Sequence, residues 1–365
     1  MGSSAVKSVA ENEGVLQNTA HGPGMSVPVS RHLQLWYLLK AMRPRQWTKN
    51  LLVFAGLVFA QRILDFGALE RAAGAFGVFC LLSGLVYMVN DLSDLESDRQ
   101  HPIKCQRPLA SGKLTVPVAI AGIVVLAMLA TLLTVVLVVW PGAAGSAQSL
   151  QVTLAPFRLS VVPSHLLSGD SQYGLLGNLG GGRYLFALVA ASYVALNLAY
   201  TFWLKQVVIV DVFCIAGGFV LRAIAGAVVI PVPISPWLYL CTILLSLFLA
   251  LGKRRQELLL LAADASLHRR ILEEYSPQLL DQMMTIVTSA TVMAYSLYTF
   301  QSTTGNHRLM ITIPFVLYGI FRYLYLIYMK KEGGSPEEVL LKDKHILGAV
   351  VLCVLSMLVL LYLAF

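Results

Sequence analysis

Long apolar runs with almost no charge are the feature of this sequence that most limits its fold. Hydrophobic residues make up 57% of the 365 residues and charged residues only 13%, whereas a soluble domain carries about 25% charged residues. Nine runs, the first helped by residues 36–39, approach the length that spans about 30 Å of hydrocarbon as a helix. They lie at 47–63, 68–90, 115–140, 183–203, 211–230, 236–252, 282–301, 309–329 and 345–364. The runs are continuous rather than alternating, which favours helices over a β-barrel, so we predict an all-α membrane bundle of about nine spans.

Basic residues predict the orientation of these spans. If the N-terminus is cytoplasmic, most of the 27 Lys and Arg residues fall on cytoplasmic segments, as the positive-inside rule requires. Nine spans then put the C-terminus outside. The net charge of +8 follows from this bias and from contact with anionic lipids, so we expect membrane lipids and no nucleic acid as partners. The five cysteines have no metal-binding or disulfide spacing.

The expected transmembrane domain covers residues 31–365; one segment precedes it and another is inserted within it. Residues 1–30 are polar and small without an apolar stretch, which predicts a disordered cytoplasmic tail rather than a signal peptide. Residues 141–182 form a long extracytoplasmic loop insertion, in which 152–163 is a candidate for lying on the membrane surface.

The second apolar run ends in a regular series of acids, Asn90-Asp91-x-x-Asp94-x-x-x-Asp98. In a continuing helix, Asn90, Asp94 and Asp98 fall on one face, with Asp91 three residues before Asp94. Carboxylates this close repel one another unless a cation lies among them. Hard oxygen ligands without His or Cys select Mg²⁺, with Mn²⁺ also compatible, and Mg²⁺ commonly brings a phosphorylated substrate. We therefore predict a metal and phosphate site at the cytoplasmic end of this span.

Basic residues follow these acids within the same loop. Lys104 and Arg107 are suited to bind phosphate oxygens directly. The alternative is that they serve only as positive-inside anchors.

The acidic series together with the following H-P-x-K-x-x-R-P-L-A-S-G resembles the first aspartate-rich motif of the UbiA superfamily of intramembrane prenyltransferases. Within it, the sequence looks most similar to polyprenyl-phosphate phosphoribosyltransferases such as decaprenyl-phosphate 5-phosphoribosyltransferase. Four more segments carry this narrower resemblance, which covers about 35–365 apart from the loop insertion: R-P-R-Q-W-T-K-N at 43–50, L-R-A-I-A-G at 221–226, G-K-R-R-Q-E-L at 252–258 and G-S-P-E-E at 334–338.

The resemblance implies a reaction between a polyprenyl phosphate and phosphoribosyl pyrophosphate in a bacterial inner membrane, with the active site facing the cytoplasm. The lipid phosphate attacks the ribose and pyrophosphate leaves, as in cell-wall precursor synthesis. The implied metal ligands are Asn90, Asp91, Asp94 and Asp98, and the three aspartates are catalytic. Lys104 and Arg107 are the matched residues for the donor phosphates.

A second motif is implied at the fourth span, Y-x-x-x-L-K-x-x-x-x-x-D, which begins at Tyr200. Lys205 and Asp211 are its catalytic candidates, and Tyr200, Lys205 and Arg222 its candidates for the donor phosphates. Superfamily members with D-x-x-x-D have a second acid here, whereas this chain keeps only Asp211. That residue is open to two roles, binding a ribose hydroxyl or completing the shell of one metal. A charged residue within a span faces a cavity or a partner, so Arg222 lines the active cavity or forms a structural ion pair.

Cations at two other cytoplasmic span ends are candidates for the acceptor phosphate: Arg43, Arg45, Lys49, Lys253 and Arg254. The alternative is an ordinary interface anchor with Trp47. Glu257 has the spacing to pair with one of the cations at 253–255.

Two other functions stay open from sequence. An aromatic prenyltransferase has the same fold and uses the metal for a polyprenyl diphosphate. A transporter typically places its charges near the membrane midplane, whereas here the acids gather at the cytoplasmic ends of spans. An oligomer is compatible with either enzyme.

Overall fold

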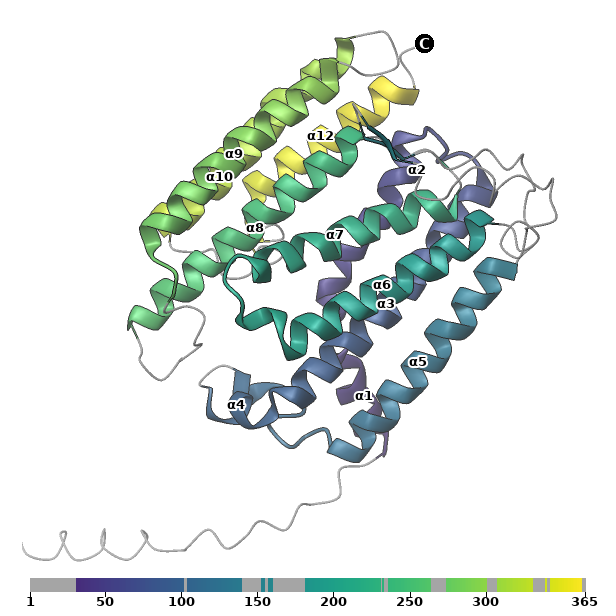
Figure 1. Cartoon of the computed structure of the whole chain (residues 1–365), viewed down its shortest axis with the longest axis vertical. Coiled ribbons are helices and arrows are strands. Elements are labelled where there is room, and N and C mark those ends of the chain that lie inside the picture. Colours follow the sequence, from purple (N-terminus) through teal and green to yellow (C-terminus); the bar gives the residue numbers. More distant parts are fainter. Residues whose placement is uncertain are drawn as a thin grey trace, which may run out of the picture.

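The computed structural model describes residues 31–101, 104–139, 152–154, 157–159, 181–230, 232, 236–263, 274–300, 307–330, 339 and 342–362. Helices form almost all of this part of the chain (Figure 1). Its elements are α1 (Arg31–Ala41), η1 (Pro44–Phe54), α2 (Ala55–Phe59), α3 (Phe66–Ser93), α4 (Leu95–Gln100), η2 (Lys104–Gln106), α5 (Val116–Val139), β1 (Val152–Leu154), β2 (Phe157–Leu159), α6 (Gly181–Phe202), η4 (Leu204–Gln206), α7 (Val210–Val229), α8 (Pro236–Ala263), α9 (Pro277–Phe300), η7 (His307–Thr312), α10 (Ile313–Tyr325), η8 (Leu326–Lys330) and α12 (Lys344–Tyr362).

Seven described helical stretches are long and apolar enough to cross a membrane, which confirms the predicted helical membrane bundle. They are Phe66–Ser93, Val116–Val139, Tyr184–Phe202, Val210–Val229, Pro277–Phe300, Arg308–Lys330 and Lys344–Tyr362. The remaining two predicted spans correspond to η1 with α2 and to α8. Helix α8 continues unbroken past the apolar run, through the basic segment that begins at Lys253.

The first predicted span, 47–63, is not one α-helix. It consists of an eleven-residue 3₁₀ helix, η1, followed by the short helix α2. Such long 3₁₀ helices are uncommon and often mark a functional or strained segment. A polar residue inside the run explains why it is not a plain lipid-facing span: Asn50 is fully buried and its amide donates to Ser83 of α3 at 3.2 Å.

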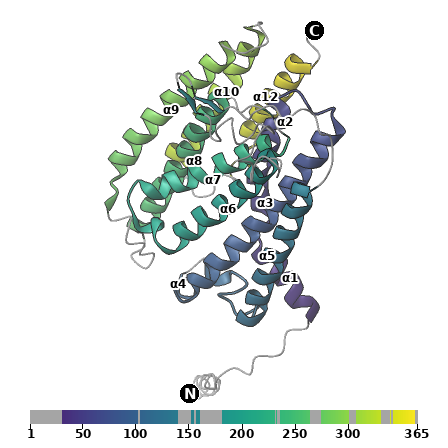
Figure 2. The ribbon, with the colours of Figure 1, turned by 45° about the vertical axis from the view of Figure 1, so that its right-hand side comes forward.

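The two ends of the bundle carry different parts of the chain. Helix α1, helix α4 and the connection from α6 to α7 lie toward one end, whereas the last turn of α12 lies at the other (Figures 1 and 2). All acids of the sequence motif therefore belong to the same end as α1. The predicted membrane orientation of these ends stays a prediction.

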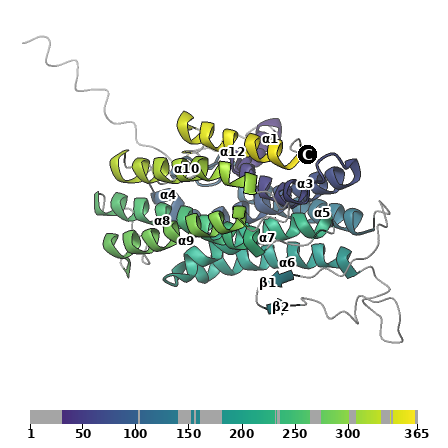
Figure 3. The same cartoon turned by 90° about the horizontal axis from the view of Figure 1, so that it is seen from above.

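Two three-residue strands depart from the all-α prediction. β1 and β2 pair antiparallel, with Val152 opposite Leu159, and lie outside the helices when the bundle is seen from above (Figure 3). They belong to the predicted loop insertion, most of which lies outside the described residues. The predicted tail, 1–30, lies outside them as well.

Candidate active site

The acidic series lies at the junction of α3 and α4. Asp94 separates the two helices with backbone angles of φ −96° and ψ 11°. Helical hydrogen bonds nevertheless continue through it, since the Asp94 amide donates to the Asn90 carbonyl at 2.9 Å and the Asp98 amide to the Asp94 carbonyl at 2.8 Å. The helical spacing predicted for Asn90, Asp94 and Asp98 is therefore present in the structure.

Two arginines neutralise the buried acids of the series. Arg43, at the start of η1, pairs with Asp91 and stacks on the Tyr87 ring at 4.9 Å. Arg107 bridges Asp91 and Asp98, with 3.1 Å between its Nη1 and Asp91 Oδ1. Asp91 and Asp98 are 3% and 2% exposed, so neither carboxylate is stable there without a cation.

Lys205 joins the second motif to the first. Its ammonium group lies 2.7 Å from Asp94 Oδ1, across 111 residues of sequence. The other oxygen of Asp94 accepts a bond from the side-chain Nδ2 of Asn90 at 3.2 Å, and the Thr201 hydroxyl of α6 donates to Asn90 Oδ1 at 3.5 Å. The two loops that carry the sequence motifs thus meet at the acidic series.

The oxygen donors form two pairs rather than one cluster. Asp91 and Asp98 share Arg107, whereas Asn90 and Asp94 lie beside Lys205. Within the described residues, no three His, Cys, Asp or Glu side chains gather closely enough to hold a metal ion. Magnesium is usually held by one or two carboxylates, with waters and substrate phosphates completing its shell. The donor set therefore fits a hard cation that arrives with a phosphorylated substrate, and the assignment of all four residues as ligands stays a prediction.

Asp211 lies in a separate buried network. Its carboxylate accepts from Arg254 Nε and from the Tyr275 hydroxyl, the latter at 2.8 Å. Arg254 also donates to the Tyr200 hydroxyl at 2.9 Å and pairs with Glu257, which confirms the predicted pairing of that acid. Asp211 and Arg254 thus bind each other in the protein interior, and their predicted contacts with ribose, metal or acceptor phosphate stay predictions.

Arg222 sits within α7 and faces polar partners. Its three guanidinium nitrogens donate to Asn50 Oδ1 at 2.7 Å, to the Gly218 carbonyl at 2.8 Å and to the Tyr193 hydroxyl at 2.7 Å. These partners are neutral, so the network differs from the structural ion pair considered above. Arg222 also lines a cavity, as predicted, while its contact with donor phosphates stays a prediction.

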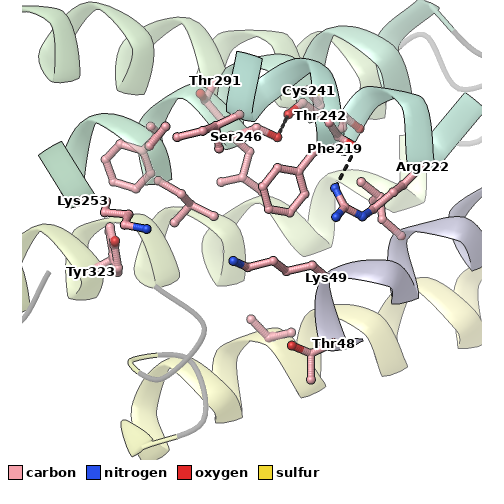
Figure 4. A pocket seen from close by; sticks show the side chains of 18 of the residues that line it. Thr48, Lys49, Phe219, Arg222, Cys241, Thr242, Ser246, Lys253, Thr291 and Tyr323 are labelled. Atoms are coloured by element: carbon pink, nitrogen blue, oxygen red, sulfur yellow. Dashed lines mark hydrogen bonds between the residues drawn. The ribbon is translucent and has the colours of Figure 1, made fainter. Parts of the chain in front are cut away.

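A cavity of about 750 Å³ lies between η1, α3, α6, α7, α8, α9, α10 and α12. Lys49 and Lys253 extend into it from different elements, toward the same part of the space (Figure 4). Its polar lining includes Arg43, Lys49, Asn197, Tyr200, Arg222 and Lys253, and its apolar lining includes Leu245, Phe248, Val316, Ile320, Val350 and Val354. One space therefore joins cations to an apolar interior.

Not every predicted cation faces this cavity. Arg45 is exposed, and Lys104 is half-buried in η2; neither is among the lining residues. Two residues that organise the site, Asn50 and Tyr275, are not among the sequence-predicted candidates. Asn50 ends the R-P-R-Q-W-T-K-N segment, which is a usable signal, whereas Tyr275 belongs to no segment that pattern or resemblance singled out.

Comparison with known proteins decides the family. The profile of the UbiA prenyltransferase family matches residues 50–154, which include the acidic series. A Corynebacterium glutamicum relative named decaprenyl-phosphate phosphoribosyltransferase is 32% identical, over 84% of this chain and 81% of the relative. A relative of the same name from Mycolicibacterium smegmatis is 34% identical, over 84% and 86%. The chain belongs to the UbiA prenyltransferase family.

Solved structures support the same fold for this UbiA family member. A UbiA homolog from Archaeoglobus fulgidus, bound to GPP and Mg²⁺, superposes with a TM-score of 0.60 at 14% sequence identity. The match covers 89% of this chain and 99% of that one. The family and the apolar helices together make this chain a multi-pass membrane protein.

Proposed function

We propose that this UbiA family member transfers the 5-phosphoribosyl group of phosphoribosyl pyrophosphate to a polyprenyl phosphate, releases pyrophosphate, and requires Mg²⁺. The relatives named decaprenyl-phosphate phosphoribosyltransferase support this reaction, since they resemble the chain over most of its length. The observation that carries the proposal is a cavity that adjoins the acidic series at Arg43 and combines cations with an apolar interior. A polyprenyl phosphate matches this cavity, since its anionic phosphate suits the cations and its hydrocarbon chain suits the apolar interior.

The donor side of the proposed reaction lies at the α3–α4 junction. Asn90, Asp91, Asp94 and Asp98 would hold Mg²⁺, which neutralises the charge that develops on the leaving pyrophosphate. Lys104, Arg107 and Lys205 would bind the donor phosphates, with Tyr200 and Arg222 deeper in the cavity. Lys205 already lies beside Asp94, and Arg107 beside Asp91 and Asp98, so charges for both metal and phosphate are within one region.

The acceptor side lies within the cavity. Arg43, Lys49 and Lys253 line it and would bind the lipid phosphate, while the neighbouring apolar residues receive the first part of the polyprenyl chain. Arg254 holds the wall beside Lys253 through Asp211 and Tyr200. The lipid phosphate is ionised at neutral pH, so the residues of the chain need only position two anions and neutralise the leaving group.

The orientation in the membrane is part of the proposed function. We place the chain in a bacterial inner membrane with the acidic series toward the cytoplasm, where a soluble pyrophosphate donor is accessible. The basic residues of the α1 and α4 end support this orientation.

The test is direct transfer by the purified protein in detergent. Labelled phosphoribosyl pyrophosphate and a polyprenyl phosphate are supplied with Mg²⁺, and label is measured in the lipid phase. Chelation with EDTA should abolish transfer, and Mg²⁺ or Mn²⁺ should restore it. Failure to label the lipid, with a polyprenyl diphosphate instead alkylating an aromatic acid, would favour the aromatic prenyltransferase.

Paired acid variants separate the metal role from general charge. Asp94→Asn removes a proposed ligand and the partner of Lys205, and should lower turnover at least hundredfold. Glu96→Gln changes a neighbouring acid of α4 that is exposed and pairs with Arg99, and should leave turnover near wild type. Equal activity of the two variants would contradict the metal assignment.

A further inference from the structure

The connection between α6 and α7 contains a strained residue. Ile209 has φ 69° and ψ −45°, and the Val210 amide donates to the Val208 carbonyl at 2.8 Å. These values describe a γ-turn of the rare, positive-φ kind. A β-branched residue at positive φ is an outlier, because its side chain crowds the backbone. Such strain persists only where surrounding contacts enforce it, and it concentrates at functional sites.

One side chain supplies the enforcing contact. The Tyr275 hydroxyl, just before α9, accepts a bond from the Ile209 amide at 2.7 Å and donates to Asp211 Oδ1 at 2.8 Å. Burial raises the pKa of Tyr275 to about 12, so the hydroxyl keeps the proton that this donation needs. Tyr275 is 4% exposed and is packed among the apolar residues of α7, α8 and α10.

The strained turn lies between two functional contacts. Four residues before it, Lys205 binds Asp94 of the acidic series. Two residues after it, Asp211 binds Arg254, which in turn binds the cavity-lining Tyr200. A change of backbone angle at Ile209 therefore moves the Lys205 end of the connection relative to α7, which begins at Val210 and carries Asp211.

We propose that Tyr275 is a positioning residue for the transferase, holding the γ-turn at Ile209 so that Lys205 reaches Asp94 on the donor side. Tyr275 is not among the residues that line the cavity, so its effect reaches the reaction through Lys205 and Asp211. This inference rests on the proposed phosphoribosyl transfer for its kinetic consequences, but its structural claim stands separately.

Tyr275→Phe removes both hydrogen bonds while keeping the ring. We expect kcat/KM for phosphoribosyl pyrophosphate to fall about tenfold to hundredfold, as the loss of one or two buried hydrogen bonds predicts. The KM of the donor and the Mg²⁺ requirement should rise, whereas the KM of the polyprenyl phosphate should stay within about twofold. Tyr328→Phe is the matched control, because it also removes a 2.8 Å bond from a tyrosine to an aspartate, Asp281, outside the cavity lining.

Substitution of the strained residue tests the mechanism. Glycine adopts positive φ without the crowding of a side chain, so Ile209→Gly should recover most of the activity lost in Tyr275→Phe. Ile209→Val keeps the β-branched crowding and should recover none. A merely structural role for Tyr275 predicts equal change of both substrate KM values and no rescue by glycine, and that result would overturn the proposal.

An activity-free measurement keeps this inference separate from the proposed function. Hydrogen–deuterium exchange of the peptide covering 203–211 should speed up at least tenfold in Tyr275→Phe and stay at the wild-type rate in Tyr328→Phe. If wild type transfers no phosphoribosyl group, the proposed function fails, yet the exchange result still decides the role of Tyr275. Unchanged exchange in Tyr275→Phe would refute it.

Discussion

Replacing Gly226 with alanine should separate η1 from α7. A Cβ atom at Gly226 would lie 1.8 Å from the carbonyl oxygen of Val53, 2.7 Å from its carbonyl carbon and 3.0 Å from its Cα. The obstacle is backbone, so no side-chain rotation relieves it, and η1 as a whole must move outward. Overpacking of this kind costs about 1–3 kcal/mol and occasionally more. The melting temperature of Gly226→Ala in detergent should therefore fall clearly below that of wild type.

The same displacement has a kinetic consequence. Because η1 carries Lys49, a proposed ligand of the lipid phosphate, into the cavity, moving it should raise the KM of the polyprenyl phosphate more than that of the ribosyl donor. Gly348→Ala in α12 is the control, since an added Cβ there meets nothing within 4 Å. If Gly226→Ala melts and turns over like this control, the close approach of η1 and α7 is wrong.

Three further outcomes follow from the same contacts. Arg107→Ala removes the cation that Asp91 and Asp98 share, so Mg²⁺ should raise the melting temperature of this variant more than that of wild type. Arg99→Ala, which loses only the exposed pair with Glu96, is the control. An equal rise in both variants would count against a metal at these acids. Lys253→Gln should raise the KM of the acceptor lipid about tenfold in the lipid-labelling assay. The control is Arg255→Gln, which changes a cation two residues farther along α8 and outside the cavity lining. Burial raises the pKa of Tyr275 from 10.0 to about 12. The neutral hydroxyl therefore stabilises the folded state fully below about pH 10, and this contribution is lost as the pH rises toward 12. Over that range the melting temperature of Tyr275→Phe should fall less steeply than that of wild type.

The sequence predicted the membrane bundle well because continuous apolar runs have few alternatives in lipid. It did not predict the 3₁₀ helix within the first run, 47–63, because hydropathy averages over single polar residues. The buried amide of Asn50 and the close approach of Gly56 to Ala227 of α7 make this segment an internal element of the bundle. A hydropathy average over neighbouring residues cannot predict either contact, because the contacting residues are far apart in the sequence.

In the candidate site, too, contacts between residues close in sequence could be predicted, whereas contacts between distant residues could not. Helical spacing predicted which face Asn90, Asp94 and Asp98 share, and the i,i+3 rule predicted the pairing of Glu257. No local rule links Lys205 to Asp94 or Tyr275 to Asp211, because those pairs are 111 and 64 residues apart and depend on how helices pack. The resemblance named Lys205 as a candidate for the donor phosphates without linking it to Asp94, and it did not single out Tyr275.

The pairing of acids and cations at the α3–α4 junction gives the proposed chemistry a constraint on charge. Arg43, Arg107 and Lys205 each neutralise an acid of the series, and the last two are also the residues proposed for donor phosphates. Arg107 and Lys205 can serve both the acids and the phosphates if they pair with the carboxylates before substrate binds and with the phosphates afterwards. The metal that accompanies the pyrophosphate then replaces them at the carboxylates, so every charge is paired before and after binding. Basic residues beside the acids are therefore a requirement of placing four proposed metal ligands at the end of a membrane span, rather than an addition to it.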